Sequence, residues 1–176
     1  MTLAPIFPEQ DLRSWSERYD YATADLTRDV IEVGEFMRQH GYLTLEHLVR
    51  LCRWKTPRTQ PRVKQNSDSF VREVTSASAA SSDERFRIEV LTLLRGVSWP
   101  TASVILHFGH ADPYPIIDFR ALWSLGQPVP SRYTFAFWWE YVQACRALAE
   151  RHGLTMREVD QALWQYSKDR QSLGNA

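Results

Sequence analysis

A short glycine-containing segment between two helical patterns carries the first chemical signal in this 176-residue sequence. The segment reads Leu94-Arg-Gly-Val-Ser-Trp-Pro-Thr-Ala-Ser-Val-Ile-Leu106. A tight turn of this kind leaves the first backbone N–H groups of the following helix without intrahelical acceptors. These donors, together with the positive end of the helix dipole, suit a phosphate group without any basic side chain. The residues expected to form this anion-binding turn are Gly96, Val97, Ser98, Trp99 and Thr101.

A single carboxylate follows the turn at a distance of about twenty residues along the chain. Asp118 stands directly before a short helical run that Gly126 and Pro128 bring to an end. Aspartate in that position is a favoured N-cap, which contributes about 1 kcal/mol to helix stability. A carboxylate can also stabilise a developing positive charge or take a proton from water. Both roles are compatible in one residue, and Arg120 can pair either with Asp118 or with a phosphate.

The segment from Arg50 to Arg72 is strongly cationic, although the formal net charge of the chain is zero. Asp68 is the single acidic residue in this stretch. A neutral chain argues mildly against a nucleic-acid partner, but the distribution of charge matters more than its sum. The side chains expected to face phosphates are Arg53, Lys55, Arg58, Arg62 and Lys64. The alternative is an ordinary solvated surface.

Apolar residues recur at helical spacing through most of the chain, and no segment alternates as a strand. The patterns predict helices near 26–37, 45–52, 67–79, 86–94, 101–108, 119–125, 135–148 and 156–166. Gly41 is expected to end the first of these helices, the serine-rich run 76–82 to be a frayed helix end or a linker, and Trp138 to lie on the apolar stripe of its helix. Phe86, Val90, Leu93 and Leu94 are expected to share one helix face. Ser81-Ser-Asp-Glu84 and Thr155-Met-Arg-Glu158 match the capping-box pattern. The polar stretch 55–66, interrupted by two prolines, is expected to be an ordered loop or two short turns. The fold class predicted is all-α, a compact helical bundle.

Length and composition place limits on the organisation of the chain. A sequence of 176 residues that is 44% hydrophobic can bury the core of one ordinary domain, which predicts a single domain over 1–176. The first residues lack a basic region followed by an apolar stretch, and no apolar run reaches membrane-spanning length. We therefore expect a cytoplasmic protein that does not enter a membrane. Cys52 and Cys145 lie among apolar neighbours, which predicts buried thiols rather than a disulfide or a metal site.

The turn resembles the helix-hairpin-helix of the HhH-GPD superfamily of DNA glycosylases. The family hairpin reads roughly Leu-x-Gly-Val-Gly-x-x-Thr-Ala, and the matching residues here are Leu94, Gly96, Val97, Thr101 and Ala102. The resemblance is specific over about Leu91 to Leu125 and places the helix-hairpin-helix at about 86–108. It implies binding to duplex DNA, extrusion of a nucleotide and hydrolysis of its N-glycosidic bond. In the family a catalytic aspartate follows the hairpin, and Asp118 is its match.

Three departures from the family pattern narrow that expectation. Ser98 replaces the second hairpin glycine, which is compatible with the turn if the backbone there avoids strongly positive φ. Pro100 stands where bifunctional members carry the lysine that attacks the sugar, so the resemblance implies monofunctional chemistry. The four-cysteine cluster of some members is absent, so no iron–sulfur cofactor is expected. The resemblance implies instead a monovalent cation held by hairpin carbonyls, and no metal held by side chains.

Several alternatives remain open at the level of the sequence. Trp54, beside the cationic segment, is a candidate to stack on an extruded base. Lys55 or Lys64 can replace the missing nucleophile if it reaches the pocket with a lowered pKa. A second hypothesis is a catalytically inactive helix-hairpin-helix module that binds DNA as an accessory factor. A third is a helical protein-interaction domain that carries the motif by chance.

Overall fold

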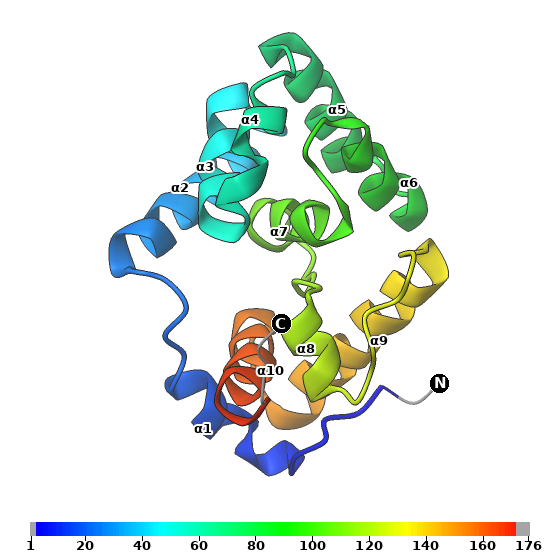
Figure 1. The fold of residues 1–176 in the computed structure, drawn as a ribbon. Helices are drawn as coiled ribbons and strands as arrows, with labels where there is room; N and C mark the ends of the chain where they lie inside the picture. Colours follow the sequence, from blue (N-terminus) through cyan, green and yellow to red (C-terminus); the bar gives the residue numbers. More distant parts are fainter. Residues whose placement is uncertain (1–2, 172–176) are drawn as a thin grey trace. The chain divides into compact units, whose positions relative to one another are not determined.

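The computed structural model describes residues 3–171 and is all-helical throughout that range, with no strand (Figure 1). This confirms the predicted all-α class. The α-helices are α1 (Leu12–Glu17), α2 (Ala24–His40), α3 (Leu45–Lys55), α4 (Gln60–Val63), α5 (Asp68–Ala80), α6 (Glu84–Glu89), α7 (Trp99–Gly109), α8 (Phe119–Ser124), α9 (Phe135–His152) and α10 (Met156–Arg170). Three short 3₁₀ helices, η1 (Glu9–Asp11), η2 (Pro57–Thr59) and η3 (Val90–Leu93), complete the list for the described part of the chain.

Contacts within the chain form two compact units where the length predicts a single domain. One unit comprises residues 22–114, and the other comprises residues 1–21 together with 115–176. The candidate hairpin and the cationic segment therefore belong to the first unit. Asp118 and Arg120 belong to the second.

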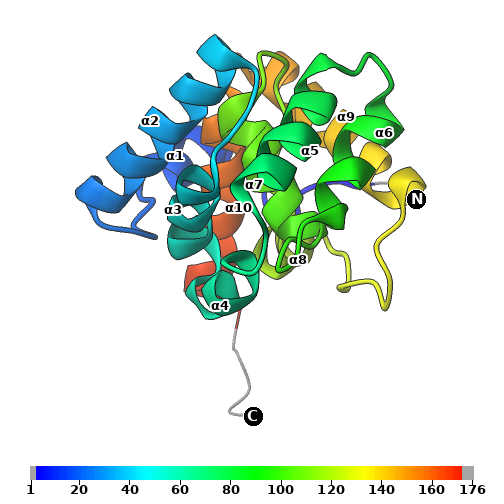
Figure 2. The ribbon, with the colours of Figure 1, turned by 90° about the horizontal axis from the view of Figure 1, so that it is seen from above.

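Helix α7 forms the centre of the 22–114 unit. Nearly all of its side chains from Thr101 to Gly109 are buried. It packs against α2 and α3, and Figure 2 shows these helices beside it. Gly34 on α2 and Gly109 on α7 have no room for a Cβ against the facing helix. The two glycines thus allow the close approach of α2 and α7 that buries the hairpin helix.

The second unit gathers α1, α8, α9 and α10 around an aromatic core. Trp138 and Tyr141 of α9 are fully buried, as the apolar stripe of that helix predicts for Trp138. Trp15 of α1 packs edge-to-face on Tyr166 of α10, with ring centroids 5.2 Å apart. The Ser124 hydroxyl of α8 donates to the Leu163 carbonyl at 2.5 Å. These contacts hold α8, and with it the residue that begins it, against α10.

Most helix ends lie where the sequence predicts them. The Thr44 side chain accepts from the His47 amide at the start of α3, and Thr155 and Glu158 form a capping box at the start of α10. Gly41 ends α2 with a left-handed φ of 77°. Stretch 55–66 folds into η2 and α4, two short turns of helix as expected.

The predicted capping box at Ser81–Glu84 is wrong. Asp83 begins α6, and its carboxylate accepts from the Phe86 amide at 2.6 Å. Aspartate competes well for the N-cap because its side-chain oxygen reaches the same orphan N–H groups. The serine-rich stretch 76–82, predicted as a frayed end or linker, also differs. It continues α5 to Ala80, and the buried Ser78 hydroxyl donates to the Arg87 carbonyl at 2.8 Å.

The predicted buried face of the helix before the hairpin needs a correction as well. Phe86 and Leu93 were expected to share one face with Leu94, yet they are 48% and 62% exposed. The helix tightens to 3₁₀ geometry at Val90, which changes the spacing of residues on each face. The buried face is formed by Ile88, Leu91 and Leu94.

The cysteines are free and buried, as predicted. Cys52 lies on α3 and Cys145 on α9, in different units. Burial raises the pKa of the Cys52 thiol to about 11. Within residues 3–171, none of the helices is both long and apolar enough to cross a bilayer.

Candidate functional site

The turn between η3 and α7 has the backbone geometry of a tight hairpin. Gly96 adopts the left-handed region with φ of 82°, and the Val97 amide donates to the Leu94 carbonyl at 3.0 Å. Ser98 is extended, with φ of −111°. Since its φ is negative, serine fits this position of the turn without strain. Val97 and Thr101 are buried, so their side chains do not contact a ligand at the surface.

Helix α7 begins differently from the other long helices of the described chain. Helices α2, α3, α5, α9 and α10 each start with a serine or threonine whose hydroxyl accepts a backbone N–H. Ser98 precedes α7, but its side chain makes no capping hydrogen bond. Pro100, in the first turn, carries no N–H. Ser98 is exposed and precedes α7 without capping it.

The hairpin is fixed to the cationic segment by one buried amide. The Asn66 side chain accepts from the Arg95 amide at 2.9 Å and donates to the Arg95 carbonyl at 3.0 Å. It also donates to the Val63 carbonyl at 2.7 Å, at the end of α4. Gly96 lies against the same helix, because a Cβ there would approach the Val63 amide nitrogen to 3.0 Å. Nothing in the spacing of the sequence pointed to Asn66, which lies thirty residues before the turn.

This contact places part of the predicted basic segment beside the hairpin. A Cβ added to Gly96 would lie 3.2 Å from the Arg62 Cβ, and Lys64 follows Val63 directly. Arg95, which the sequence did not single out, is exposed in the hairpin itself, and its guanidinium donates to the Gln65 side chain at 3.1 Å. Arg62, Lys64 and Arg95 together are called the hairpin patch below.

The remaining basic residues lie on α3, η2 and α5. Arg50 is held by Asp29 and Glu32 of α2, and Arg72 pairs with Asp68 at 2.5 Å. Arg53 lies 3.9 Å from Asp29, and its side chain is 57% exposed. Arg58 is exposed on η2, whereas Lys55 is half-buried at the end of α3. Of the residues predicted to contact phosphate, Arg62 therefore lies at the turn, and Lys64 follows two residues later in the chain.

Trp54 lies in the interior of the 22–114 unit. It is 5% exposed and packs edge-to-face on Phe108 of α7, with ring centroids 5.4 Å apart. An extruded base needs an accessible aromatic face. This placement favours a structural role for Trp54, which packs α3 against α7.

Asp118 caps α8, as its position in the sequence predicts. Its Oδ1 atom accepts from the Arg120 amide at 3.0 Å and from the Ala121 amide at 2.9 Å. The Arg120 guanidinium lies over the rings of Phe119 and Trp164, 5.1 and 5.3 Å from their centroids. Both capping bonds converge on one oxygen and hold the carboxylate in a fixed orientation at the start of the helix.

Tyr133 is a titratable residue close enough to Asp118 to feel its charge, and the sequence did not reveal it. Burial, and then the negative charge of Asp118, raise the pKa of the Tyr133 hydroxyl. The phenol therefore stays protonated at neutral pH and can donate a hydrogen bond in the vicinity of the carboxylate. Only the fold of the 115–171 stretch brings the two residues together, because Tyr133 lies in the loop before α9.

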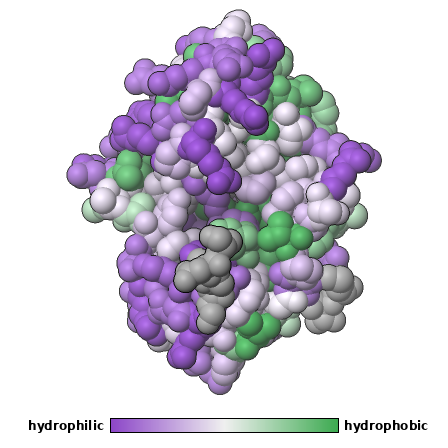
Figure 3. Space-filling model, in the orientation of Figure 1, coloured by the Kyte–Doolittle hydropathy of each residue, from purple (hydrophilic) through white to green (hydrophobic). Residues whose placement is uncertain are grey.

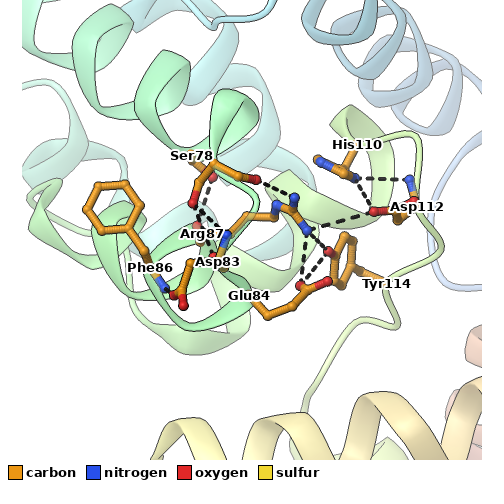
Figure 4. Close-up of polar contacts among 9 residues, drawn as sticks. Ser78, Asp83, Glu84, Phe86, Arg87, His110, Asp112 and Tyr114 are labelled. Atoms are coloured by element: carbon orange, nitrogen blue, oxygen red, sulfur yellow. Dashed lines mark hydrogen bonds and ion pairs between the residues drawn. The ribbon is translucent and has the colours of Figure 1, made fainter.

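A buried arginine anchors the chain where it leaves α7 (Figure 4). The Arg87 guanidinium donates to the Tyr114 hydroxyl and the Ser81 carbonyl, and it lies 3.1 Å from the Glu84 carboxylate. The Tyr114 hydroxyl in turn donates to Glu84 at 2.6 Å. Burial raises the pKa of Tyr114 to about 12, which keeps this donor protonated. Tyr114 is the last residue of the 22–114 unit, so the network fixes the origin of the segment that leads to Asp118.

Comparison of the chain with protein-family models, with curated proteins and with solved structures found no match.

Proposed function

We propose that this chain binds duplex DNA through the hairpin and hydrolyses the N-glycosidic bond of an extruded base with Asp118. The observation that carries the DNA contact is the uncapped start of α7 beside the hairpin patch. A phosphate oxygen can accept from the first-turn N–H groups while Arg62, Lys64 and Arg95 lie within reach of the same backbone. Such contacts position DNA without reading its sequence.

The proposed reaction assigns the charged step to Asp118. Cleavage of the bond between C1′ and the base nitrogen sends the electron pair to the base and leaves positive charge on the sugar. A carboxylate stabilises that charge, and it can accept the proton from the water that attacks C1′. The proton from water finally passes to the departing base, so the products are the free base and an abasic site. Pro100 supplies no amine, which supports hydrolysis over attack by a hairpin lysine.

Asp118→Asn tests the reaction with little change to the fold. Asparagine is also a good N-cap, so its side-chain oxygen can keep both bonds that Asp118 accepts from α8. We expect DNA binding to persist and base release to disappear. The assay is a panel of duplexes with uracil, alkylated or oxidised bases and mismatches, resolved on gels before and after hot alkali. Cleavage by the variant at the parental rate would remove Asp118 from the mechanism.

The same panel examines a lysine in the role of nucleophile. Lys64 is exposed in the hairpin patch, and Lys55 lies at the end of α3. Borohydride traps the Schiff base that an amine forms with the sugar. We expect no trapped adduct and strand breaks only after alkali. If an adduct is trapped with the parent and not with Lys64→Ala, Lys64 is the nucleophile and the monofunctional mechanism is wrong.

A binding module without catalysis is the second candidate. Asp118 caps α8, and this structural role is sufficient to account for an aspartate at that position without catalysis. This observation favours the binding module. This candidate predicts binding to a duplex that contains an abasic analogue and no base release from any duplex in the panel. If the protein shows no salt-dependent binding to DNA, the result favours the third hypothesis, a helical protein-interaction domain.

A further inference from the structure

Three exposed apolar side chains lie on the arm that leads into the hairpin. The arm consists of α5 and, returning beside it, α6 and η3, with residues 81–83 as the connection (Figures 1 and 2). Phe70 on α5 is 42% exposed and Leu93 on η3 is 62% exposed. Phe86, at the other end of the arm, is 48% exposed.

The connectivity of the arm places Phe70 and Leu93 at the hairpin end. Asn66 bonds to Arg95 across that end, while Ser78 bonds to Arg87 further along the arm. Phe70 follows Asn66 by one helical turn, and Leu93 precedes Arg95 by two residues. The two apolar side chains therefore lie on facing elements next to the hairpin patch, whereas Phe86 lies in the first turn of α6 and points away from the Arg87 network (Figure 4).

Basic side chains lie close to this apolar pair, while Asp68, an acidic residue near Phe70 on α5, is paired with Arg72. Arg62, Lys64 and Arg95 are exposed beside the Asn66 contact. In the space-filling view, an apolar area over α5 and α6 borders the hydrophilic area over α4 (Figure 3). Proteins that bind single-stranded nucleic acid combine these two features, because cations hold the backbone while apolar and aromatic side chains stack on bases. An intact duplex hides the faces of its bases and offers nothing for Phe70 to stack on.

We propose that Phe70 and Leu93 contact unpaired bases, so that the preferred substrate is DNA with a local bulge or gap. This proposal rests on the proposed DNA contact of the hairpin and specifies the class of DNA that the protein binds. The hairpin holds the backbone of the paired part, and the apolar pair receives bases that have lost their stacking partners. Charge complementarity favours DNA over an apolar protein partner at this place, since the pair is bordered by the hairpin patch.

The test compares two fluorescein-labelled DNA probes with the full chain. One is an intact duplex, and the other is the same duplex with a short thymine bulge, both titrated by fluorescence anisotropy at one salt concentration. We expect the parent to bind the bulged probe more tightly. Phe70→Ser and Leu93→Ser should each reduce affinity for the bulged probe about fivefold or more and leave affinity for the intact duplex unchanged.

Phe86→Ser is the matched control on the same arm. It removes an equally exposed phenylalanine at the end away from the hairpin patch and should leave both affinities unchanged. Equal affinity of the parent for the two probes overturns this proposal alone, whereas no binding to either probe overturns the proposed function. A dimer in sedimentation that Phe70→Ser dissociates would also overturn it, since the apolar pair would then contact a second copy. Circular dichroism verifies that the variants are folded.

Discussion

Ser98 occupies the N-cap position of α7 but does not cap the helix. The residue precedes α7 in extended conformation, but its hydroxyl does not accept a backbone N–H. An uncapped start costs a helix about 1 kcal/mol relative to a capped one. A phosphate at that position would satisfy the same N–H groups, so the missing cap is consistent with a turn that receives its acceptor from a ligand.

Ser98→Asp should therefore raise stability and lower DNA affinity. The aspartate carboxylate can cap α7 and interact favourably with its dipole, which adds about 1 kcal/mol to the free energy of unfolding. The same charge repels phosphate and occupies its donors, which should weaken DNA binding on the order of tenfold, or about 1.4 kcal/mol. Urea denaturation and anisotropy measure the two effects. Ser98→Ala, which adds no charge, should leave binding close to that of the parent.

His47 makes the start of α3 sensitive to pH. Its Nδ1 atom accepts from the Thr44 amide, which requires that this nitrogen carry no proton. Burial, and then the charge of Arg50, lower its pKa below 6.5 in the folded state. As pH falls below about 6.5, the unfolded chain takes up this proton first, so the stabilisation present at neutral pH is lost. We expect His47→Gln, which keeps an acceptor in the capping box, to reduce the loss of stability between about pH 7 and pH 5.

Individual residues differ in how well the sequence predicts them. Asp118 and Thr155 were identified because a capping side chain acts within three residues of its own position. Asn66, Arg87 and Tyr133 were missed because their partners lie far away along the chain. Short-range competition also misled the prediction at Ser81, where Asp83 is the better acceptor two residues later.

At the scale of the element, the hairpin depends on Gly96 for two independent reasons. The residue has a positive φ, and a Cβ would press on Val63 of α4. Gly41 at the end of α2 has a similar φ of 77° but open space around it. Substitutions at the two glycines therefore distinguish the cost of a positive φ, which both share, from the cost of a steric clash, which only Gly96 has.

Gly96→Ala should destabilise the chain more than Gly41→Ala does. Placing alanine in the left-handed region costs about 1 kcal/mol at either position. At Gly96 the contact with Val63 adds a further cost of about 1 kcal/mol or more. Urea denaturation followed by circular dichroism measures both. Equal losses at the two positions would contradict the close packing of the turn on α4.

The helices themselves were predicted well where a cap and an apolar stripe coincide, as in α2, α3, α9 and α10. The arm before the hairpin was predicted less well. A change from α to 3₁₀ geometry at Val90 shifts the spacing of the buried residues, and such a change leaves no periodic signal in a segment of ten residues. That shift is what leaves Leu93 exposed.

At the scale of the whole molecule, a net charge of zero conceals an uneven distribution. Between Arg53 and Lys64 the chain has basic residues and no acidic one. Binding to DNA should therefore weaken steeply with salt, although the protein is neutral as a whole. The chain divides into units 22–114 and 1–21 with 115–176, and this division depends on contacts between distant residues, which chain length does not report.

Arg62→Ala with Lys64→Ala should flatten that salt dependence. Each phosphate contact contributes a slope of about −0.9 to the plot of log affinity against log salt, so loss of both contacts should reduce the slope by about 2. Anisotropy titrations over a series of potassium chloride concentrations measure it. The matched control is Arg28→Ala on α2, which removes one exposed cation that pairs with Asp25. A parental slope in the double variant would place the DNA elsewhere.

The interior of α7 is buried and its start is exposed, so the backbone amides at the start can be used to detect ligand binding. Its interior from Ala102 to Leu106 is buried, while its first turn begins at the exposed Ser98. In native-state hydrogen exchange, amides of the interior should exchange only on large-scale opening, whereas those of the first turn should exchange rapidly. A ligand that accepts hydrogen bonds from the turn would slow exchange at the Ser98 and Trp99 amides selectively. Hydrogen exchange can thus locate an occupant of the hairpin before its chemical identity is known.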